Sequence, residues 1–206
     1  MATSVISVKG LENPTLALIK HFESLHDGDL TKIGLQPKMD PVGIWTVAWG
    51  RALRNPKTGK FLKGEADRKL AYELFPSLTE QEADLMLEID LKSEYIPILN
   101  NQLNSLKSPV AQPGNLKPHE FGALLAFSYN CGTHYKNSLG VRKPYAIWDM
   151  VNKYKGGLIS GTQLRDYWKD SVIKSQGQVL RGLKRRRRSE VHYFLSGELQ
   201  FDNFNY

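Results

Sequence analysis

The spacing of apolar residues changes character at Pro76, and this change most constrains the fold. Before Pro76, glycine, proline and polar residues interrupt short β-type stretches, of which Ile44–Trp49 is the clearest. After Pro76, apolar residues recur mainly at helical spacing. We therefore expect an α+β fold within a single domain. A small antiparallel sheet lobe, about residues 12–75, should precede a larger helical lobe, about residues 76–206.

Capping and proline signals mark the ends of several expected helices. Asn13 followed by Pro14 is typical of a helix start, and the apolar stripe after them places Glu23 near the end of that first helix. Thr79 and Glu82 have the spacing of a capping box. Further helices are expected from Pro118 to a stop at Gly132, and at Pro144–Tyr154, Leu164–Trp168 and Leu180–Leu195.

The composition is that of an ordinary globular protein. The chain is 41% hydrophobic and 24% charged, which fits neither a disordered nor a membrane protein. Its net charge of +7 favours polyanionic partners, such as nucleic acid, anionic lipid or an acidic wall polymer. Met1–Leu11 lacks the basic and apolar pattern of an export signal. The single cysteine, Cys131, excludes an internal disulfide and leaves a cytosolic origin as the simpler expectation.

Three side chains form a candidate site for cleaving a glycosidic bond. That reaction needs a carboxyl group to protonate the leaving oxygen and an ionised partner to position water or stabilise positive charge. Glu23 follows the apolar residues Ile19 and Phe22, whereas Asp40 lies on a turn, so the two carboxylates have unlike surroundings. Thr46 could hold a water molecule between them. By residue type and spacing alone, a helix-surface glutamate and a turn-forming aspartate are the commoner situation.

Four motifs, in chain order, resemble the phage T4-type lysozymes of glycoside hydrolase family 24. Ile19–Glu23 and Asp40–Gly50 together are similar to the family pattern I-K-x-F-E-G followed by D-x-x-G-x-x-T-I-G-Y-G. In this pattern the aspartate, glycine and threonine keep their relative spacing. The remaining matches are Leu78–Ala83 with Asp90 and Leu91, then Phe121–Gly132, then Gly182–Glu190.

The resemblance implies a lysozyme-like fold and hydrolysis of the β-1,4 bond between N-acetylmuramic acid and N-acetylglucosamine. By analogy, Glu23 is the general acid, Asp40 positions or activates water, and Thr46 helps to hold that water. No metal or organic cofactor is implied. The resemblance also implies a monomeric phage endolysin that acts on peptidoglycan glycan strands to lyse the host. Such a protein would stay in the host cytoplasm until holin pores release it to the cell wall.

The chain departs from the family pattern at three places. The segment His26–Met39 lengthens the interval between the acid and the aspartate, and Ser24 and Ala48 replace two family glycines. The identity of the aspartate, Asp40, is therefore less firmly indicated than that of the glutamate. We hypothesise that the extra segment, expected as a loop or a short strand ribbon, contacts the substrate.

Other residues have a functional and a structural interpretation. Asn130 could hydrogen-bond an acetamido group of the substrate or cap a helix end. Trp45 and Trp49 could stack on sugars, but strand alternation favours packing in the core. Cys131 with His134 could suggest a thiol nucleophile, although a buried small side chain is the better expectation. The five histidines lack zinc-ligand spacing, which argues against a metal-dependent amidase.

The run Lys184–Arg188 is the strongest local concentration of charge. Arg186 and Arg187 fit the family motif and are expected to be structural. Lys184, Arg185 and Arg188 lie on an expected amphipathic helix and could contact an anionic outer-membrane surface. A solvated helix face is the commoner role for such a run.

Two other function classes compete with a muramidase. A lytic transglycosylase also cuts peptidoglycan with a glutamate, but it forms an anhydro sugar and needs neither Asp40 nor Thr46. A nucleic-acid-binding protein would fit the net charge, yet no recognised binding motif accompanies the arginine run, so a nucleic-acid partner is not expected. Product analysis separates the two enzymes because hydrolysis leaves a reducing end.

Overall fold

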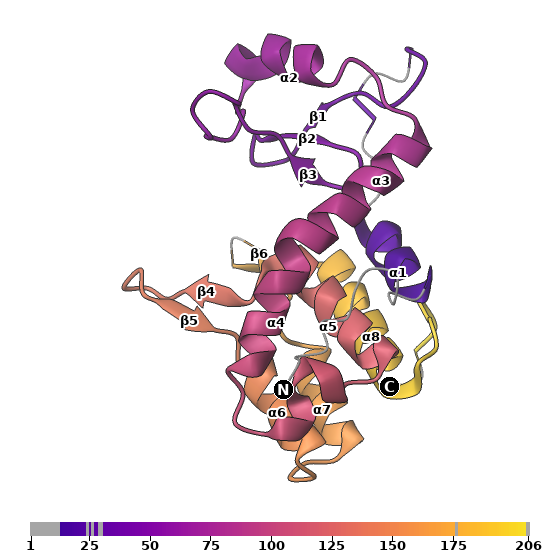
Figure 1. The fold of residues 1–206 in the computed structure, drawn as a ribbon, viewed down its shortest axis with the longest axis vertical. Helices are drawn as coiled ribbons and strands as arrows, with labels where there is room; N and C mark the ends of the chain where they lie inside the picture. Colours follow the sequence, from indigo (N-terminus) through magenta and orange to yellow (C-terminus); the bar gives the residue numbers. More distant parts are fainter. Residues whose placement is uncertain (1–12, 24, 26, 29–30, 176, 205–206) are drawn as a thin grey trace. The chain divides into compact units, whose positions relative to one another are not determined.

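The computed structural model describes residues 13–23, 25, 27–28, 31–175 and 177–204 (Figure 1). Two sequence expectations lie outside these residues, namely the N-terminal segment Met1–Leu11 and the glycine replacement at Ser24. His26, at the start of the inserted segment, also lies outside them. In the part of the chain that is described, no helix combines the length and the apolar character needed to cross a membrane.

The chain divides into two compact units. The sheet unit is Glu23–Asp90, and the helical unit combines Met1–Phe22 with Leu91–Tyr206. These bounds differ from the expected lobes of about 12–75 and 76–206, since the first helix belongs almost wholly to the helical unit and the helix after Thr79 belongs to the sheet unit. The single catalytic domain with two lobes stays a prediction. Both units mix helices with short antiparallel strands, so the α+β fold class is confirmed.

The sheet unit is built on three short strands. Its elements are β1 (Lys38–Met39), β2 (Trp45–Val47), β3 (Arg51–Ala52), the 3₁₀ helix η2 (Glu65–Asp67), α2 (Arg68–Leu74) and α3 (Glu80–Asp90). The strands are antiparallel in the order β1-β2-β3, with Lys38 opposite Thr46 and Val47 opposite Arg51. The expected strand Ile44–Trp49 is thus shorter than its sequence pattern indicates. It ends because Ala48 adopts a left-handed backbone conformation with a φ of 54°.

Two tryptophans fill the core of the sheet unit, as strand alternation predicts. Trp45 and Trp49 are buried, and each indole N–H finds a partner inside the unit. Trp45 donates to the carbonyl oxygen of Gly64 at 2.8 Å, and its ring lies 5.9 Å from that of Tyr72 in α2. Trp49 donates to Asp84 Oδ1 at 2.7 Å, which ties the sheet to α3. This tie is one reason why α3 belongs to the sheet unit.

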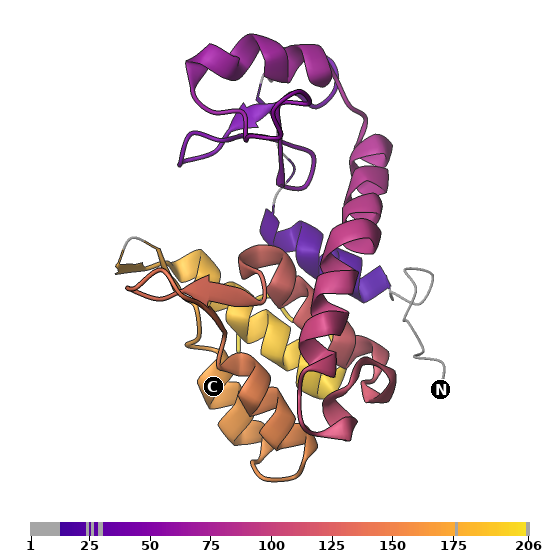
Figure 2. The same cartoon turned by 60° about the vertical axis from the view of Figure 1, so that its left-hand side comes forward.

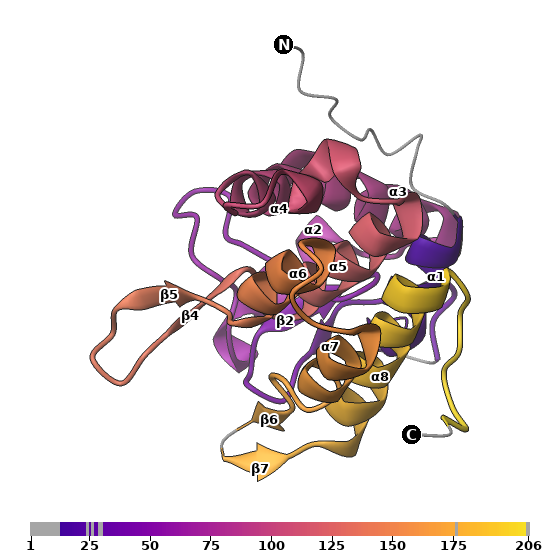
Figure 3. The same cartoon turned by 90° about the horizontal axis from the view of Figure 1, so that it is seen from below.

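The helical unit contains the buried helix α5, and other helices of the unit pack against it. Its helices are most of α1 (Asn13–Glu23), then the π-helix η3 (Leu91–Tyr95), α4 (Ile96–Asn104), the 3₁₀ helices η4 (Pro109–Ala111) and η5 (Pro113–Asn115), α5 (Pro118–Cys131), α6 (Ile147–Lys155), α7 (Gly161–Trp168) and α8 (Arg181–Ser196). Its strands are the hairpins β4 (His134–Lys136) with β5 (Arg142–Pro144), and β6 (Lys174–Ser175) with β7 (Gln178–Val179). Helices α5 and α8 lie side by side (Figures 2 and 3).

A proline explains the change of helix type between α3 and α4. The chain stays helical from Glu80 to Asn104, but Pro97 has no N–H to donate within this continuous helix. Its ring also crowds the preceding turn, so the regular bonding pattern cannot run through it. The wider π-helical segment η3 comes just before this proline, at the point where the sheet unit ends and the helical unit resumes.

A buried cluster of charges joins α8 to the rest of the helical unit. Glu190 is fully buried and pairs with Arg186 Nε at 3.1 Å and with Arg187 Nη1 at 3.0 Å. Trp168 donates to the same carboxylate at 3.2 Å, and Arg186 donates to the carbonyl oxygen of Ala126 in α5 at 3.1 Å. Burial raises the pKa of Glu190, and the two guanidinium groups act in the opposite direction. The structural role expected for both arginines is confirmed.

Removing the carboxylate of this cluster should strongly destabilise the fold. Glu190→Gln leaves two buried guanidinium groups without their charge partner, so we expect the free energy of unfolding to fall by about 3–5 kcal/mol. Asp149→Asn is the matched control, because Asp149 pairs with Lys153 on the surface and its loss should cost under about 1 kcal/mol. Urea denaturation measures both changes. Equal small effects would contradict the role assigned to the buried cluster.

Candidate active site

The carboxylate of Glu23 lies against the backbone of Gly50. Glu23 is the last residue of α1 and is half-buried. A β-carbon added at Gly50 would stand 3.0 Å from Glu23 Oε2, closer than side chains normally approach. Gly50 also has a φ of 89°, a conformation that residues with a β-carbon rarely adopt. The backbone conformation therefore favours glycine here, and a β-carbon would also push the end of the Glu23 side chain aside by a few tenths of an ångström.

The same turn contains Ala48, where the family pattern has glycine. Ala48 is buried and keeps a glycine-like φ of 54°. A left-handed conformation costs a residue with a β-carbon roughly 1–2 kcal/mol, so the surrounding structure must hold it in place. The replacement noted in the sequence therefore preserves the backbone path between β2 and β3 that brings Gly50 to Glu23.

Asp40 is fixed by the turn between β1 and β2. Its Oδ1 accepts hydrogen bonds from the backbone N–H groups of Val42 at 2.9 Å and Ile44 at 2.8 Å. Its backbone carbonyl accepts from the N–H of Gly43 at 3.0 Å, and Gly43 has a φ of 84°. Asp40 thus forms the turn through one carboxylate oxygen. The same two bonds fix the orientation of its whole carboxylate group.

Thr46 lies in the central strand of the sheet unit. Its side chain is buried, and its hydroxyl donates to the carbonyl oxygen of Lys38 at 2.9 Å. Because the hydroxyl hydrogen points to Lys38, Thr46 can meet a water molecule only as a hydrogen-bond acceptor.

All three predicted catalytic residues belong to the sheet unit. Pairing of Lys38 with Thr46 places Asp40 on the same hairpin as Thr46. Four residues after Thr46 the chain reaches Gly50, which lies against Glu23. Asp40 and Thr46 thus lie on one hairpin, and the turn that follows the hairpin reaches Glu23; the shared catalytic role of the three side chains stays a prediction.

Two contacts with α3 hold the turn that contains Gly50, one from the turn itself and one from β3. Trp49 bonds to Asp84, and Arg51 Nη2 lies 3.5 Å from Asp90 Oδ1. Sequence reasoning did not find these pairs. Asp90 belongs to the family match that begins at Leu78, but nothing in its spacing indicates Arg51 as its partner. Asp84 belongs to no motif. Their contacts flank Gly50 and hold its turn on α3.

The inserted segment is tied to the stretch before α3 within the sheet unit. Leu35 and Leu78 exchange backbone hydrogen bonds of 2.7 and 2.9 Å, and Ser77 Oγ donates to the carbonyl oxygen of Ile33 at 2.9 Å. Gln36 is buried. The described part of the segment, residues 27–28 and 31–39, is therefore anchored near its centre, and it ends in β1.

Asn130 belongs to the helical unit. Arg187 Nη2 donates to Asn130 Oδ1, so a buried guanidinium group already engages the amide oxygen. The C-cap of α5 is Gly132, with a φ of 73°, rather than Asn130. The expected contact of Asn130 with an acetamido group stays a prediction.

Two further basic residues of the run Lys184–Arg188 pair with carboxylates of the helical unit. Lys184 Nζ lies 3.4 Å from Asp170 Oδ1, and Arg185 Nε lies 2.9 Å from Asp202 Oδ1. Arg188 is half-buried. Of the apolar residues expected on this helix, Val191 and Phe194 are buried, whereas Leu180 at its N-cap is 42% exposed. The expected envelope contact through α8 stays a prediction.

Among the residues that the structure describes, no group of three or more His, Cys, Asp and Glu side chains is arranged to hold a metal ion.

Known proteins resemble this chain in sequence and in fold. The endolysins of Lactococcus phage c2 and Lactococcus phage phivML3 are each 28% identical over 117 residues, which is 56% of this chain and 40% of each relative. The match thus spans less than half the length of these relatives. The active form of the P1 phage endolysin Lyz has a TM-score of 0.55 at 20% identity, covering 91% of this chain and 86% of its own.

A second solved structure has the same fold. The endolysin from Escherichia coli O157:H7 phage FAHEc1 has a TM-score of 0.55 at 23% identity, covering 92% of this chain and 96% of its own. These likenesses confirm the lysozyme-like fold. The family model described as phage lysozyme matches residues 30–190, which is most of the chain. The chain therefore belongs to the phage lysozyme family.

Proposed function

We propose that this protein is a muramidase that hydrolyses the β-1,4 bonds between N-acetylmuramic acid and N-acetylglucosamine in bacterial peptidoglycan, and so lyses a phage host. Membership of the phage lysozyme family supports this proposal, and so do the two endolysin relatives. The observation that carries it is the position of the Glu23 carboxylate against Gly50, in the same unit as Asp40 and Thr46.

Each of these residues has a role in the proposed reaction. Glu23 donates its proton to the glycosidic oxygen as the bond to the anomeric carbon breaks. A water molecule adds to that carbon and gives a proton to the carboxylate of Asp40, whose Oδ1 is fixed by two backbone N–H groups. Thr46 accepts a hydrogen bond from the same water and so helps to orient it. Because all three residues belong to one unit, a monomer acting as a single catalytic domain suffices.

The route to the substrate is part of the same proposal. Peptidoglycan lies outside the cytoplasmic membrane. Release from the host cytoplasm through holin pores, which the family resemblance implies, would bring the protein to the wall.

A thiol mechanism is disfavoured by the surroundings of Cys131. The Sγ atom donates to the carbonyl oxygen of Phe127 at 3.2 Å, inside the last turn of α5. Burial raises the pKa of the Cys131 thiol from 9.0 to about 12, against the opposing effect of Arg187. The thiol is therefore protonated at neutral pH and is a poor nucleophile. The surroundings of the two residues therefore favour carboxylate chemistry at Glu23 over thiol chemistry at Cys131.

Glu23→Gln should abolish most of the lytic activity while the chain stays folded. Glutamine keeps the shape of the side chain but has no acidic proton, so we expect a rate loss of about a hundredfold to ten-thousandfold. Turbidity loss of outer-membrane-stripped Gram-negative cells measures the rate, and circular dichroism checks folding. Glu73→Gln is the matched control, because Glu73 is an exposed residue of the same unit and forms a surface ion pair with Lys69 at 3.7 Å. Wild-type activity of Glu23→Gln would overturn the assignment of the acid.

Asp40→Asn tests hydrolysis against transglycosylation. Asparagine can still accept the two backbone hydrogen bonds through its own Oδ1, so the turn should persist while the negative charge is lost. We expect a rate loss of about a hundredfold or more, with products of the wild-type enzyme that carry reducing ends. Mass spectrometry of digested peptidoglycan identifies the ends. Anhydro products together with full activity of Asp40→Asn would show a lytic transglycosylase instead.

Cys131 should react slowly with thiol reagents in the folded protein. A pKa of about 12 instead of 9.0 means about a thousandfold less thiolate at pH 8, and the reaction rate should fall accordingly. Reaction with a chromogenic disulfide, with and without urea, measures this ratio. As pH rises toward 12, the native rate should climb toward the unfolded rate. Fast modification of the native thiol at pH 8 would contradict its burial.

A further inference from the structure

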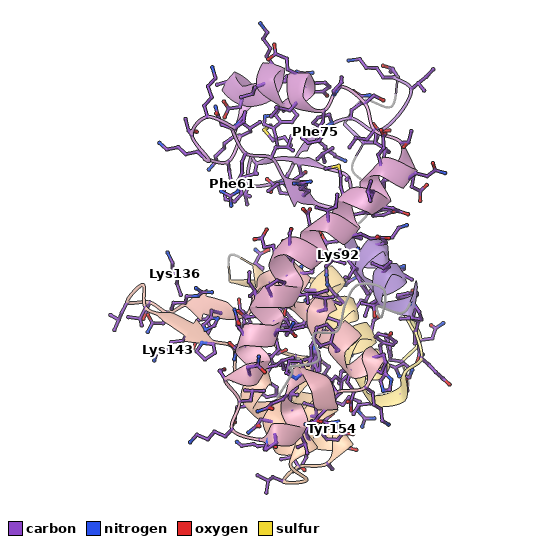
Figure 4. All side chains as sticks on the ribbon, in the orientation of Figure 1. Phe61, Phe75, Lys92, Lys136, Lys143 and Tyr154 are labelled. Carbon is purple, nitrogen blue, oxygen red and sulfur yellow. The ribbon has the colours of Figure 1, made fainter. Side chains whose placement is uncertain are left out.

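The hairpin β4–β5 extends beyond the helices of its own unit (Figures 2 and 4). Its base is held firmly. The backbone N–H of Tyr145 donates to the carbonyl oxygen of Thr133 at 3.2 Å, and the indole of buried Trp148 donates to the same oxygen at 2.8 Å. The Tyr145 ring also packs on Phe127 of α5, with centroids 5.8 Å apart. The hairpin is therefore a projection anchored in the core.

The strands of this hairpin carry an excess of positive charge. No Asp or Glu occurs between Glu120 and Asp149 in the sequence. Lys136 lies directly opposite Arg142, and Lys143 is the next residue of β5. All three side chains are exposed, and none takes part in an ion pair among the described residues.

Like charges that face each other across two strands destabilise the pairing. The field of these cations also reaches the neck of the hairpin. The pKa of His134 is lowered, first by burial and then by Arg142. An anion bound between the strands would relieve this repulsion.

The tip of the hairpin is apolar and ordered. Leu139 is 83% exposed and Val141 is 51% exposed, although both are large apolar residues. Asn137 Oδ1 accepts hydrogen bonds from the backbone N–H groups of both, at 3.1 Å from Leu139 and 2.9 Å from Val141. The tip is therefore already fixed in shape, and little conformational entropy would be lost when it binds.

We propose that the β4–β5 hairpin binds the surface of a membrane that contains anionic phospholipid. Leu139 and Val141 would enter the interfacial region, while Lys136, Arg142 and Lys143 would meet the phosphate groups. Tyr135, which is half-exposed on β4, has the amphipathic ring favoured at that depth. This inference concerns the helical unit alone and does not depend on the chemistry proposed for Glu23.

Charge complementarity and the apolar tip together select this partner. A soluble polyanion would satisfy the cations but would leave the tip in water. A membrane interface accepts both, because lysine and arginine stems can lie along apolar chains while their charged groups stay among the headgroups. Helix α8 is less suitable, since Lys184 and Arg185 already face carboxylates and its apolar residues Val191 and Phe194 are buried.

Vesicle co-sedimentation of the full chain tests the proposal. Vesicles of phosphatidylcholine alone are compared with vesicles that also contain phosphatidylglycerol. We expect binding only to the second kind, and a loss of about thirtyfold in the partition coefficient for the double variant Lys136→Glu, Lys143→Glu. The matched control is Lys57→Glu, Lys60→Glu, which makes the same change in net charge at an exposed turn of the sheet unit. This control should bind nearly as well as the wild type.

A second variant tests the apolar contact. Leu139→Ser, Val141→Ser keeps every charge and should weaken binding at least about tenfold, because it removes apolar area from the interface. Circular dichroism and activity on purified peptidoglycan should stay at wild-type levels for all three variants, which separates a binding defect from misfolding and from any failure of the muramidase proposal.

Four outcomes would overturn the membrane proposal. The first is equal binding of the wild type to both kinds of vesicle, or to neither kind. The second is an equal loss of vesicle binding in the two lysine variants, and the third is unchanged vesicle binding of the serine variant. The fourth is a hairpin variant that loses binding to purified peptidoglycan but still binds vesicles. The last of these would assign the hairpin to the wall polymer.

Discussion

The contact between a carboxylate and a glycine backbone is the constraint on which the candidate site depends. A β-carbon at Gly50 would stand only 3.0 Å from Glu23 Oε2, so the carboxylate lies close against the glycine. The contact requires a turn with left-handed residues at positions 48 and 50, and it requires that turn to stay in place. Trp49 and Arg51 provide this by contacts to Asp84 and Asp90. The turn at residues 48 to 50 and the helix α3 that holds it thus determine what surrounds the Glu23 carboxylate.

Local signals predicted most of the helices, although not α2 or α4, because the ends of the predicted ones are determined by adjacent residues. The helix opened by Pro118 stops before Gly132, whose φ of 73° suits glycine, and Thr79 and Glu82 form the expected reciprocal bonds at the start of α3. The strand after Ile44 was predicted too long, since an alanine gives no sign that it will adopt a left-handed conformation. Hairpin β4–β5 was missed because its strands are short and are held by contacts such as that of Trp148.

The sequence predicted which residues make up the candidate site, but it did not predict the contacts that hold them. Spacing and family resemblance pointed to Glu23, Asp40 and Thr46, and the structure assigns all three to one unit. Their supporting contacts join positions far apart in the sequence, such as 49 with 84, which no local pattern encodes. The arginine run shows the same limit. Adjacent residues of a helix point in different directions, so Arg186 and Arg187 are buried whereas Arg185 faces solvent and Asp202.

The turn at residues 48 to 50 also limits how this protein can change through evolution or design. Position 48 accepts a methyl group at a modest conformational cost, so glycine and alanine can replace each other there without moving the backbone. Position 50 has less freedom, because a β-carbon there would combine a φ of 89° with a contact of 3.0 Å to Glu23 Oε2, so the carboxylate would have to shift. Substitutions near the Glu23 carboxylate should therefore be better tolerated at residue 48 than at residue 50. In a mutant library that randomised both positions, active members should carry substitutions at residue 48 more often than at residue 50.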